Sequence, residues 1–147
     1  IRAYVKNRLE AMGIQVQFEV KGLNASRRLS PAIETALFRI IQEATNNIVK
    51  HADAHKVGIY LSVENEMIKA VVEDDGKGFD PDSVFSSGSS RQSLGLLGIK
   101  ERVALLGGTF VVRSRRHQGA RLMVEIPVVY QLPSSEIKQD EAASKPV

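Results

Sequence analysis

One segment of the chain combines a carboxylate, a carboxamide and two basic side chains at helical spacing. Glu43 and Asn47 are four residues apart, and Lys50 and His51 follow within the next turn. Carboxylate and amide oxygens are ligands that Mg²⁺ accepts, and nearby cations suit the phosphates that often accompany this metal. An ordinary solvent-facing polar pair has the same spacing, and this segment alone favours that simpler interpretation.

Two glycine-containing motifs downstream are typical of backbone that approaches a ligand closely. Asp74, Gly76 and Gly78 form a D-x-G-x-G motif directly after an apolar strand pattern. A plain tight turn accounts for this motif equally well. Gly95 and Gly98 open the next helical pattern, and the first amides of a helix favour anions such as phosphate. Neither motif is specific by itself.

The helix that must present Glu43 and Asn47 has clear start signals and a core-facing stripe. Ser30 is a suitable N-cap, and Pro31 suits the first helical position, where no amide hydrogen is required. Glu43, Asn47 and Lys50 fall about a quarter turn from the apolar stripe, so we expect them at the rim of a core. The stripe recurs at spacings of three and four and consists of Ile33, Ala36, Leu37, Ile40, Ile41, Ala44 and Ile48.

Periodicity along the rest of the chain predicts alternating strands and helices. Residues 82–94 are rich in Ser and lack apolar periodicity, which predicts a mobile loop. The hydrophobic content of 43% over 147 residues suffices for one domain with a core. We therefore predict an α/β (α+β) two-layer sandwich, in which helices cover one face of a mixed, mostly antiparallel sheet. The expected strands are 15–20, 56–63, 67–73, 109–116 and 120–126, and the expected helices are 1–12, 30–51 and 99–106, the last opened by Gly95–Gly98.

Composition excludes several classes of protein. The chain has no cysteine, which rules out thiolate metal sites and disulfide scaffolds. No apolar run reaches the roughly twenty residues that span a bilayer. The P-loop motif and the G-x-G-x-x-G motif are both missing. Lys and Arg exceed Asp and Glu by only 20 to 17, a mild bias compatible with phosphates or acidic partners.

The order and spacing of the motifs are more specific than any one motif. The motifs follow one another in this order: Glu43-x-x-x-Asn47-x-x-Lys50-His51, Asp74-x-Gly76-x-Gly78, a Ser-rich loop, Gly95-x-x-Gly98, Gly107-Gly108 and Gln118-Gly119-Ala120. Over about residues 30–127 this pattern resembles the ATP-binding catalytic domain of sensor histidine kinases. These domains have the GHKL (Bergerat) fold, which they share with gyrase, MutL and a heat-shock chaperone. Within the group, the pattern is most similar to nitrate-sensor-like and membrane-fluidity-sensor-like bacterial proteins.

The resemblance implies roles for individual residues. Asn47 is expected to hold Mg²⁺ against the phosphates of ATP, and Glu43 to order that metal and its waters. Both are thus catalytic and metal-site residues. Lys50 and His51 are expected near the phosphates or the ribose, and Asp74 to accept a hydrogen bond from the adenine amino group. The other nucleotide-binding positions are expected to be Gly76, Gly78, Phe79, Gly95, Leu96, Gly98 and Gly119, with residues 79–94 as the ATP lid.

One departure from the family pattern concerns the last hairpin. The family often has Gly-x-Gly-Thr before the final strand, whereas this chain has Gln118-Gly119-Ala120. A hydroxyl that contacts a phosphate or stabilises the loop is therefore missing at Ala120.

The resemblance also implies parts of a larger protein. A histidine kinase phosphorylates a histidine on separate dimerisation helices, and neither His51, His55 nor His117 has the context of that acceptor. We therefore expect residues 1–13 to end a linker or dimerisation helix, 14–129 to form the catalytic domain, and 130–147 to be a disordered tail. The expected reaction passes the γ-phosphoryl group of ATP to the acceptor histidine and on to a response regulator. We expect no nucleic-acid partner and no membrane contact for this domain. Its expected location is cytoplasmic, within a sensor attached to the bacterial inner membrane.

Three other interpretations stay open. A GHKL-type serine kinase or ATPase regulator shares the same motifs, although a chain that ends soon after the last hairpin argues against the gyrase and chaperone types. A basic binding module with a vestigial pocket is suggested by the arginines of residues 109–126, but aromatic residues make up only 5% of the chain, which weakens base stacking. His51 and His55 have the spacing of zinc ligands on a helix but lack a third ligand.

Overall fold

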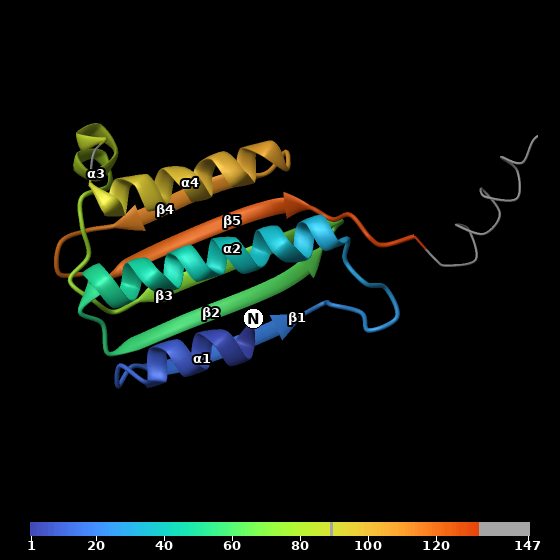
Figure 1. Ribbon diagram of the computed structural model, residues 1–147, viewed down its shortest axis with the longest axis horizontal. Helices are drawn as coiled ribbons and strands as arrows, with labels where there is room; N and C mark the ends of the chain where they lie inside the picture. Colours follow the sequence, from blue (N-terminus) through green and yellow to red (C-terminus); the bar gives the residue numbers. More distant parts are fainter. Residues whose placement is uncertain (89, 133–147) are drawn as a thin grey trace, which may run out of the picture.

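The computed structural model describes residues 1–88 and 90–132. Over these residues, five strands form one sheet, and α1, α2 and α4 lie on the same face of it (Figure 1). The strands are β1 (Gln15–Lys21), β2 (Lys56–Glu64), β3 (Met67–Asp74), β4 (Thr109–Ser114) and β5 (Ala120–Pro127). The helices are α1 (Arg2–Glu10), α2 (Pro31–Asn47), its π-helical continuation η1 (Ile48–Ala52), α3 (Pro81–Ser87) and α4 (Arg91–Leu105).

The sheet is mixed and mostly antiparallel, as predicted. Its strand order is β1-β2-β3-β5-β4. β1 runs parallel to β2, while the pairs β2–β3, β3–β5 and β5–β4 are antiparallel. The two predicted hairpins are confirmed. The two hairpins pair with each other through β3 and β5, so that Asp74 at the end of β3 is in register with Ala120 at the start of β5.

The core lies between the sheet and the helices. The inner sheet face contributes alternate residues such as Ile59 and Val124, both fully buried. Burying one such side chain stabilises the fold by about 1.5–3 kcal/mol. Val5 and Leu9 of α1 are also fully buried, so α1 packs into this same core. All members of the predicted α2 stripe are buried, namely Ile33, Ala36, Leu37, Ile40, Ile41, Ala44 and Ile48.

α2 begins as predicted but ends differently. The Ser30 hydroxyl accepts a hydrogen bond from the amide of Ile33 at 3.4 Å, and Pro31 occupies the first turn. After Asn47 the helix continues as the π-helical turn η1, which ends at Asp53 in a left-handed conformation (φ 50°). Such turns change which residues share a face, and they are frequent at functional sites. Here the turn leaves His51 half-buried and Lys50 exposed.

The prediction of a mobile loop over residues 82–94 and a helix opened by Gly95 is wrong. Two capped helices occupy this stretch instead. The Asp80 carboxylate accepts the amide of Asp82 at 3.1 Å, and the Ser90 hydroxyl accepts the amide of Ser93 at 3.1 Å. The serines that suggested flexibility thus include a helix N-cap, a role that serine hydroxyls perform well. Ser89 lies outside the described residues.

The last described residues pair with the loop before α2. Leu29 and Tyr130 form a β-bridge, and the amide of Gln131 donates to the carbonyl of Arg28 at 2.8 Å. Arg27 lies 3.8 Å above the Tyr130 ring. Tyr130 and Gln131, which we expected in the tail, are therefore held by this loop, and residues 133–147 lie outside the described part. No helix of the described part is long and apolar enough to cross a membrane.

Candidate functional site

A small cavity lined mostly by apolar side chains, with a few polar groups among them, lies where α2, the end of β3 and α4 meet. Its volume is about 50 Å³. Six residues expected at the site line it, namely Asn47, His51, Asp74, Gly78, Phe79 and Leu96. The fold thus brings together residues from three separate stretches of the chain. The cavity has room for a few water molecules but is too small for an adenine ring.

The polar atoms of this cavity are incompletely paired. Asn47 Nδ2 and His51 Nε2 are buried and have no hydrogen-bond partner within the described residues. A buried polar group without a partner costs about 1–3 kcal/mol. Burial lowers the pKa of His51, and the positive charges of Lys50 and Lys77 lower it further. The neutral imidazole is therefore favoured at this position.

Glu43 and Asn47 face α4 across a very short gap. A methyl group placed on Gly95 would overlap Glu43 Oε1 and would lie 3.2 Å from Asn47 Oδ1. The pair thus sits at the rim of the core, as predicted, and the side-chain ends of Glu43 and Asn47 fill the space beside Gly95. Within the described residues there is no cluster of three or more His, Cys, Asp or Glu side chains that could hold a metal ion. Phosphate oxygens, like the carboxamide oxygen of Asn47, are ligands that Mg²⁺ accepts.

Two adjacent aspartates after β3 have different surroundings. Burial raises the pKa of Asp74, while the backbone amide of Gly76, which donates to Asp74 Oδ1 at 2.8 Å, opposes that shift. Asp75 Oδ1 instead accepts the amides of His55 and Lys56 at 2.8 and 2.9 Å, and these backbone hydrogen bonds, that of Lys56 above all, lower the pKa of Asp75. Asp75 Oδ1 thus serves to bind backbone amides of the protein itself. Asp74 faces the cavity and keeps lone pairs that can accept further hydrogen bonds.

The glycines of the D-x-G-x-G motif allow protein backbones to approach one another. A Cβ atom on Gly76 would overlap the carbonyl of Ala52, and one on Gly78 would overlap the carbonyl of Arg115. Likewise, a Cβ atom on Gly119 would overlap the carbonyl of Asp74. Gly78 and Gly119 also have positive φ angles of 59° and 70°, which glycine adopts without strain. Gly78 and Gly119 thus let the loop after β3 lie against the β4–β5 turn, and Gly76 lets it lie against the end of η1.

Some positions expected near the phosphates do not line the cavity in this structure. α4 begins at Arg91, so the amides of residues 95–98 lie within the helix and are not free for phosphate. Lys50 and Gly98 are exposed and do not line the cavity. Sequence reasoning also missed Gln92, which lines the cavity from the first turn of α4. The N-cap Ser90 was the signal that could have placed Gln92 on a helix.

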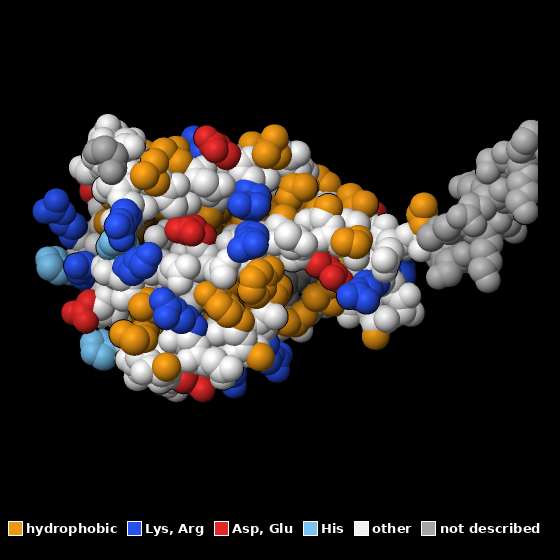
Figure 2. All heavy atoms as spheres, in the orientation of Figure 1, with side chains coloured by type: hydrophobic (Ala, Val, Ile, Leu, Met, Phe, Trp, Pro, Cys, Tyr) orange, Lys and Arg blue, Asp and Glu red, His pale blue; other side chains and the backbone are white. Residues whose placement is uncertain are grey.

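Basic side chains gather at the end of the molecule where α2 ends and the last hairpin turns. Figure 2 shows Lys, Arg and His side chains at that end. The exposed cations of the segments that meet there are Lys50, Lys77, Arg115 and Arg116. Their combined field attracts anions to the mouth of the cavity.

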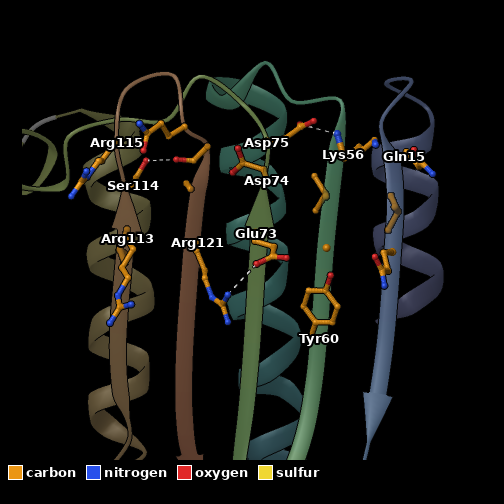
Figure 3. A pocket seen from close by; sticks show the side chains of 18 of the residues that line it. Gln15, Lys56, Tyr60, Glu73, Asp74, Asp75, Arg113, Ser114, Arg115 and Arg121 are labelled. Carbon is orange, nitrogen blue, oxygen red and sulfur yellow. Dashed lines mark hydrogen bonds and ion pairs between the residues drawn. The ribbon is translucent and has the colours of Figure 1, made fainter.

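A larger hollow of about 860 Å³ lies on the helix-free face of the sheet (Figure 3). Tyr60, Glu73, Arg113 and Arg121 lie across it, and Arg121 pairs with Glu73 at 3.4 Å. Of the expected site residues, only Asp74 and Gly119 line this hollow, and Asp74 lines the smaller cavity as well. The smaller cavity is therefore the candidate site.

Known proteins match this chain in sequence and in fold. A family model described as histidine kinase-, DNA gyrase B-, and HSP90-like ATPase matches residues 32–130. The signal transduction histidine-protein kinase/phosphatase DegS of Bacillus subtilis (strain 168) is 33% identical over 129 residues, which are 87% of this chain and 33% of DegS. UhpB of Salmonella typhimurium (strain LT2), described in the same words, is 43% identical over 102 residues, 69% of this chain and 19% of UhpB. The solved structure of full-length ShkA in complex with AMPPNP has a TM-score of 0.70 at 24% identity, covering 89% of this chain and 29% of that one.

The mixed sheet with helices on one face is the fold of a solved histidine kinase, and the matching family model is that of histidine kinase-like ATPases. The chain belongs to the histidine kinase-, DNA gyrase B- and HSP90-like ATPase family, as the matched residues show. It spans about a third or less of the length of the curated relatives reported above. The narrower likeness to nitrate-type and membrane-fluidity-type sensors stays a prediction.

Proposed function

We propose that this chain binds Mg²⁺-ATP in the cavity between α2, β3 and α4, and donates the γ-phosphoryl group to a histidine. The observation that carries the proposal is the set of unpaired polar atoms in that cavity. Asn47 Nδ2 and His51 Nε2 lack partners there, and the Asp74 carboxylate lines the same space. A bound nucleotide offers donors and acceptors for all three groups.

Asp74 is the residue proposed to recognise the base. Its carboxylate can accept a hydrogen bond from the adenine amino group, whereas guanine presents a carbonyl oxygen at the equivalent position. Two carbonyl or carboxylate oxygens facing each other repel, so Asp74 favours ATP over GTP. Phe79 and Leu96 supply apolar walls for the base.

Asn47 and Glu43 are proposed to serve the metal. Mg²⁺ neutralises the charge of the phosphates, which phosphoryl transfer requires more than covalent chemistry from the protein. The carboxamide of Asn47 offers an oxygen, and Glu43, one turn earlier, can order metal-bound water. Lys50 and His51 lie at the phosphate end, where the exposed cations already create a positive field.

Binding also requires the lid to open. The cavity of about 50 Å³ is closed by Gln92 and Leu96 of α4 and by Phe79 after the loop. We propose that residues 79–94 move outward as the nucleotide enters. Such a lid movement also excludes water from the reacting phosphate once it closes again.

The phosphoacceptor histidine, a response regulator and a membrane anchor are proposed to belong to other parts of the signalling system. The relatives carry the words histidine-protein kinase in their names and are much longer than this chain. In this proposal α1 continues a linker or dimerisation helix, and the domain lies in the cytoplasm. Residues 14–129 form the catalytic domain.

Calorimetric titration of the purified chain with ATP and with GTP, each with and without Mg²⁺, tests the proposal. We expect binding of ATP that strengthens with Mg²⁺, and much weaker binding of GTP. Equal affinity for the two nucleotides, or no binding of either, would contradict the proposed function.

A further inference from the structure

Ser114, the last residue of β4, joins two segments that border the site. Its hydroxyl accepts a hydrogen bond from the amide of Phe79 at 2.9 Å and donates one to the carbonyl of Gly119 at 2.7 Å. Figure 3 shows the Ser114 side chain at the end of its strand. Within residues 1–88 and 90–132, it is the one side chain that hydrogen-bonds between the loop of residues 74–79 and the turn of residues 115–119.

The two partners of Ser114 are close to the groups that face the cavity. Phe79 lines the cavity, and Gly119 packs directly on the carbonyl of Asp74. Two backbone hydrogen bonds also join the segments, from His117 to Lys77 at 2.6 Å and from Gly119 to Gly76 at 2.9 Å. These bonds hold the middle of the loop. Ser114 holds its far end, where the chain leaves toward α3.

Ser114 also lies opposite Ala120, where the expected hydroxyl is missing. Ser114 and Ala120 are paired in register across β4 and β5. A hydroxyl on either strand at this level points to the same side of the sheet, because paired residues share a face. Ser114 thus places a hydroxyl on β4 at the same level of the sheet as Ala120, which has none.

A serine hydroxyl at the end of a strand often does no more than satisfy a nearby backbone group. Ser114 differs because its donor partner, Phe79, is 35 residues away in the sequence. It therefore fixes one segment relative to another, which a local turn contact does not do.

We propose that Ser114 is a positioning residue for the base-binding wall, holding Phe79 and Gly119 so that Asp74 presents its carboxylate to adenine. The inference rests on the proposed function, since it assigns the base end of the same site. It predicts that loss of the hydroxyl weakens every adenine nucleotide equally, with or without metal. The phosphate end of the site, at Asn47, is left intact.

The experiment measures affinity for Mg²⁺-ATP and for metal-free ADP by calorimetry in the wild type and in four variants. Ser114→Ala is expected to weaken both nucleotides about tenfold, equivalent to about 1.4 kcal/mol. Ser114→Thr keeps the hydroxyl and is expected to restore wild-type affinity. Ser114→Cys, with a weaker donor and acceptor, is expected to fall between these two. Ser62→Ala, which removes a half-buried hydroxyl from β2 away from the cavity, is expected to change neither affinity.

Urea unfolding of each variant separates positioning from stability. If Ser114→Ala does not fold, the inference is still tested by comparing the other two variants, because Ser114→Cys is expected to bind nucleotide more weakly than Ser114→Thr. Unchanged affinity in Ser114→Ala, or a loss confined to Mg²⁺-ATP, would overturn it, as would a folded Ser114→Thr that binds no better than Ser114→Ala. A wild type that binds neither nucleotide contradicts the proposed function itself.

Discussion

Gly95 on α4 and Glu43 on α2 lie so close together that a methyl group on Gly95 would overlap the Glu43 carboxylate. The carboxylate thus occupies the space that a side chain at position 95 would fill. Asn47 lies against the same glycine. The packing of two helices thus fixes the pair proposed to serve the metal.

Gly95→Ala is expected to displace Glu43 and to weaken Mg²⁺-dependent ATP binding by tenfold or more. Gly98→Ala, on the same helix, is the matched control, because a methyl group on Gly98 would meet no other atom within 4 Å. Alanine at an exposed helical position should stabilise the fold by up to about 1 kcal/mol. Calorimetry and urea unfolding of both variants check this. Equal nucleotide affinity in the two variants would contradict the role given to the gap between Gly95 and Glu43.

Asn47→Ala is expected to abolish the gain in ATP affinity that Mg²⁺ provides while the fold survives. The substitution removes a buried amide nitrogen that has no partner, so the free energy of unfolding should stay the same or rise. Asn46→Ala, one residue earlier and outside the cavity lining, should leave the magnesium effect intact. The readout is the ratio of ATP affinities with and without Mg²⁺. A ratio that is unchanged in Asn47→Ala would remove Asn47 from the metal site.

Asp74→Asn and Asp75→Asn are expected to have opposite effects. Because burial raises the pKa of Asp74, its charge is unfavourable in the fold, and the amide should cost little stability. Its effect should appear in binding, as a loss of the preference for ATP over GTP. Asp75→Asn should keep that preference but lose about 1 kcal/mol of stability, because the carboxylate accepts two backbone amides. Affinities for both nucleotides and urea midpoints distinguish the two outcomes.

His51 is expected to make stability depend on pH below neutrality. Burial, with Lys50 and Lys77, lowers the pKa of His51 in the fold, so the unfolded chain binds the proton more readily. The contribution is full above the ordinary histidine pKa of about 6.5 and is lost as the pH falls through the window below it. His51→Gln should reduce the fall in urea midpoint between about pH 7.5 and 5.5, whereas His55→Gln, at an exposed position, should not. An identical fall in His51→Gln and the wild type would show that this imidazole is not responsible.

The α2 stripe and the two hairpins could be predicted because each depends on a local period of apolar residues. The packing roles of Gly76 and Gly119 could not, since they depend on carbonyls of Ala52 and Asp74 that only the folded chain brings near. α3 and the first turn of α4 were missed because their caps are Asp80 and Ser90, residue types equally common in loops. The sequence predicted which residues belong to the site. It did not predict the small size of the cavity, which depends on how far α4 extends toward its N-terminal end.

The two hollows of the domain allow a direct test of where the nucleotide binds. Amide chemical shifts of the uniformly ¹⁵N-labelled chain should be recorded during titration with Mg²⁺ and a non-hydrolysable ATP analogue. We predict the largest changes at Asn47, His51, Asp74 and Leu96, together with the lid. Changes centred instead on Tyr60, Glu73 and Arg113, in the hollow of Figure 3, would contradict the account.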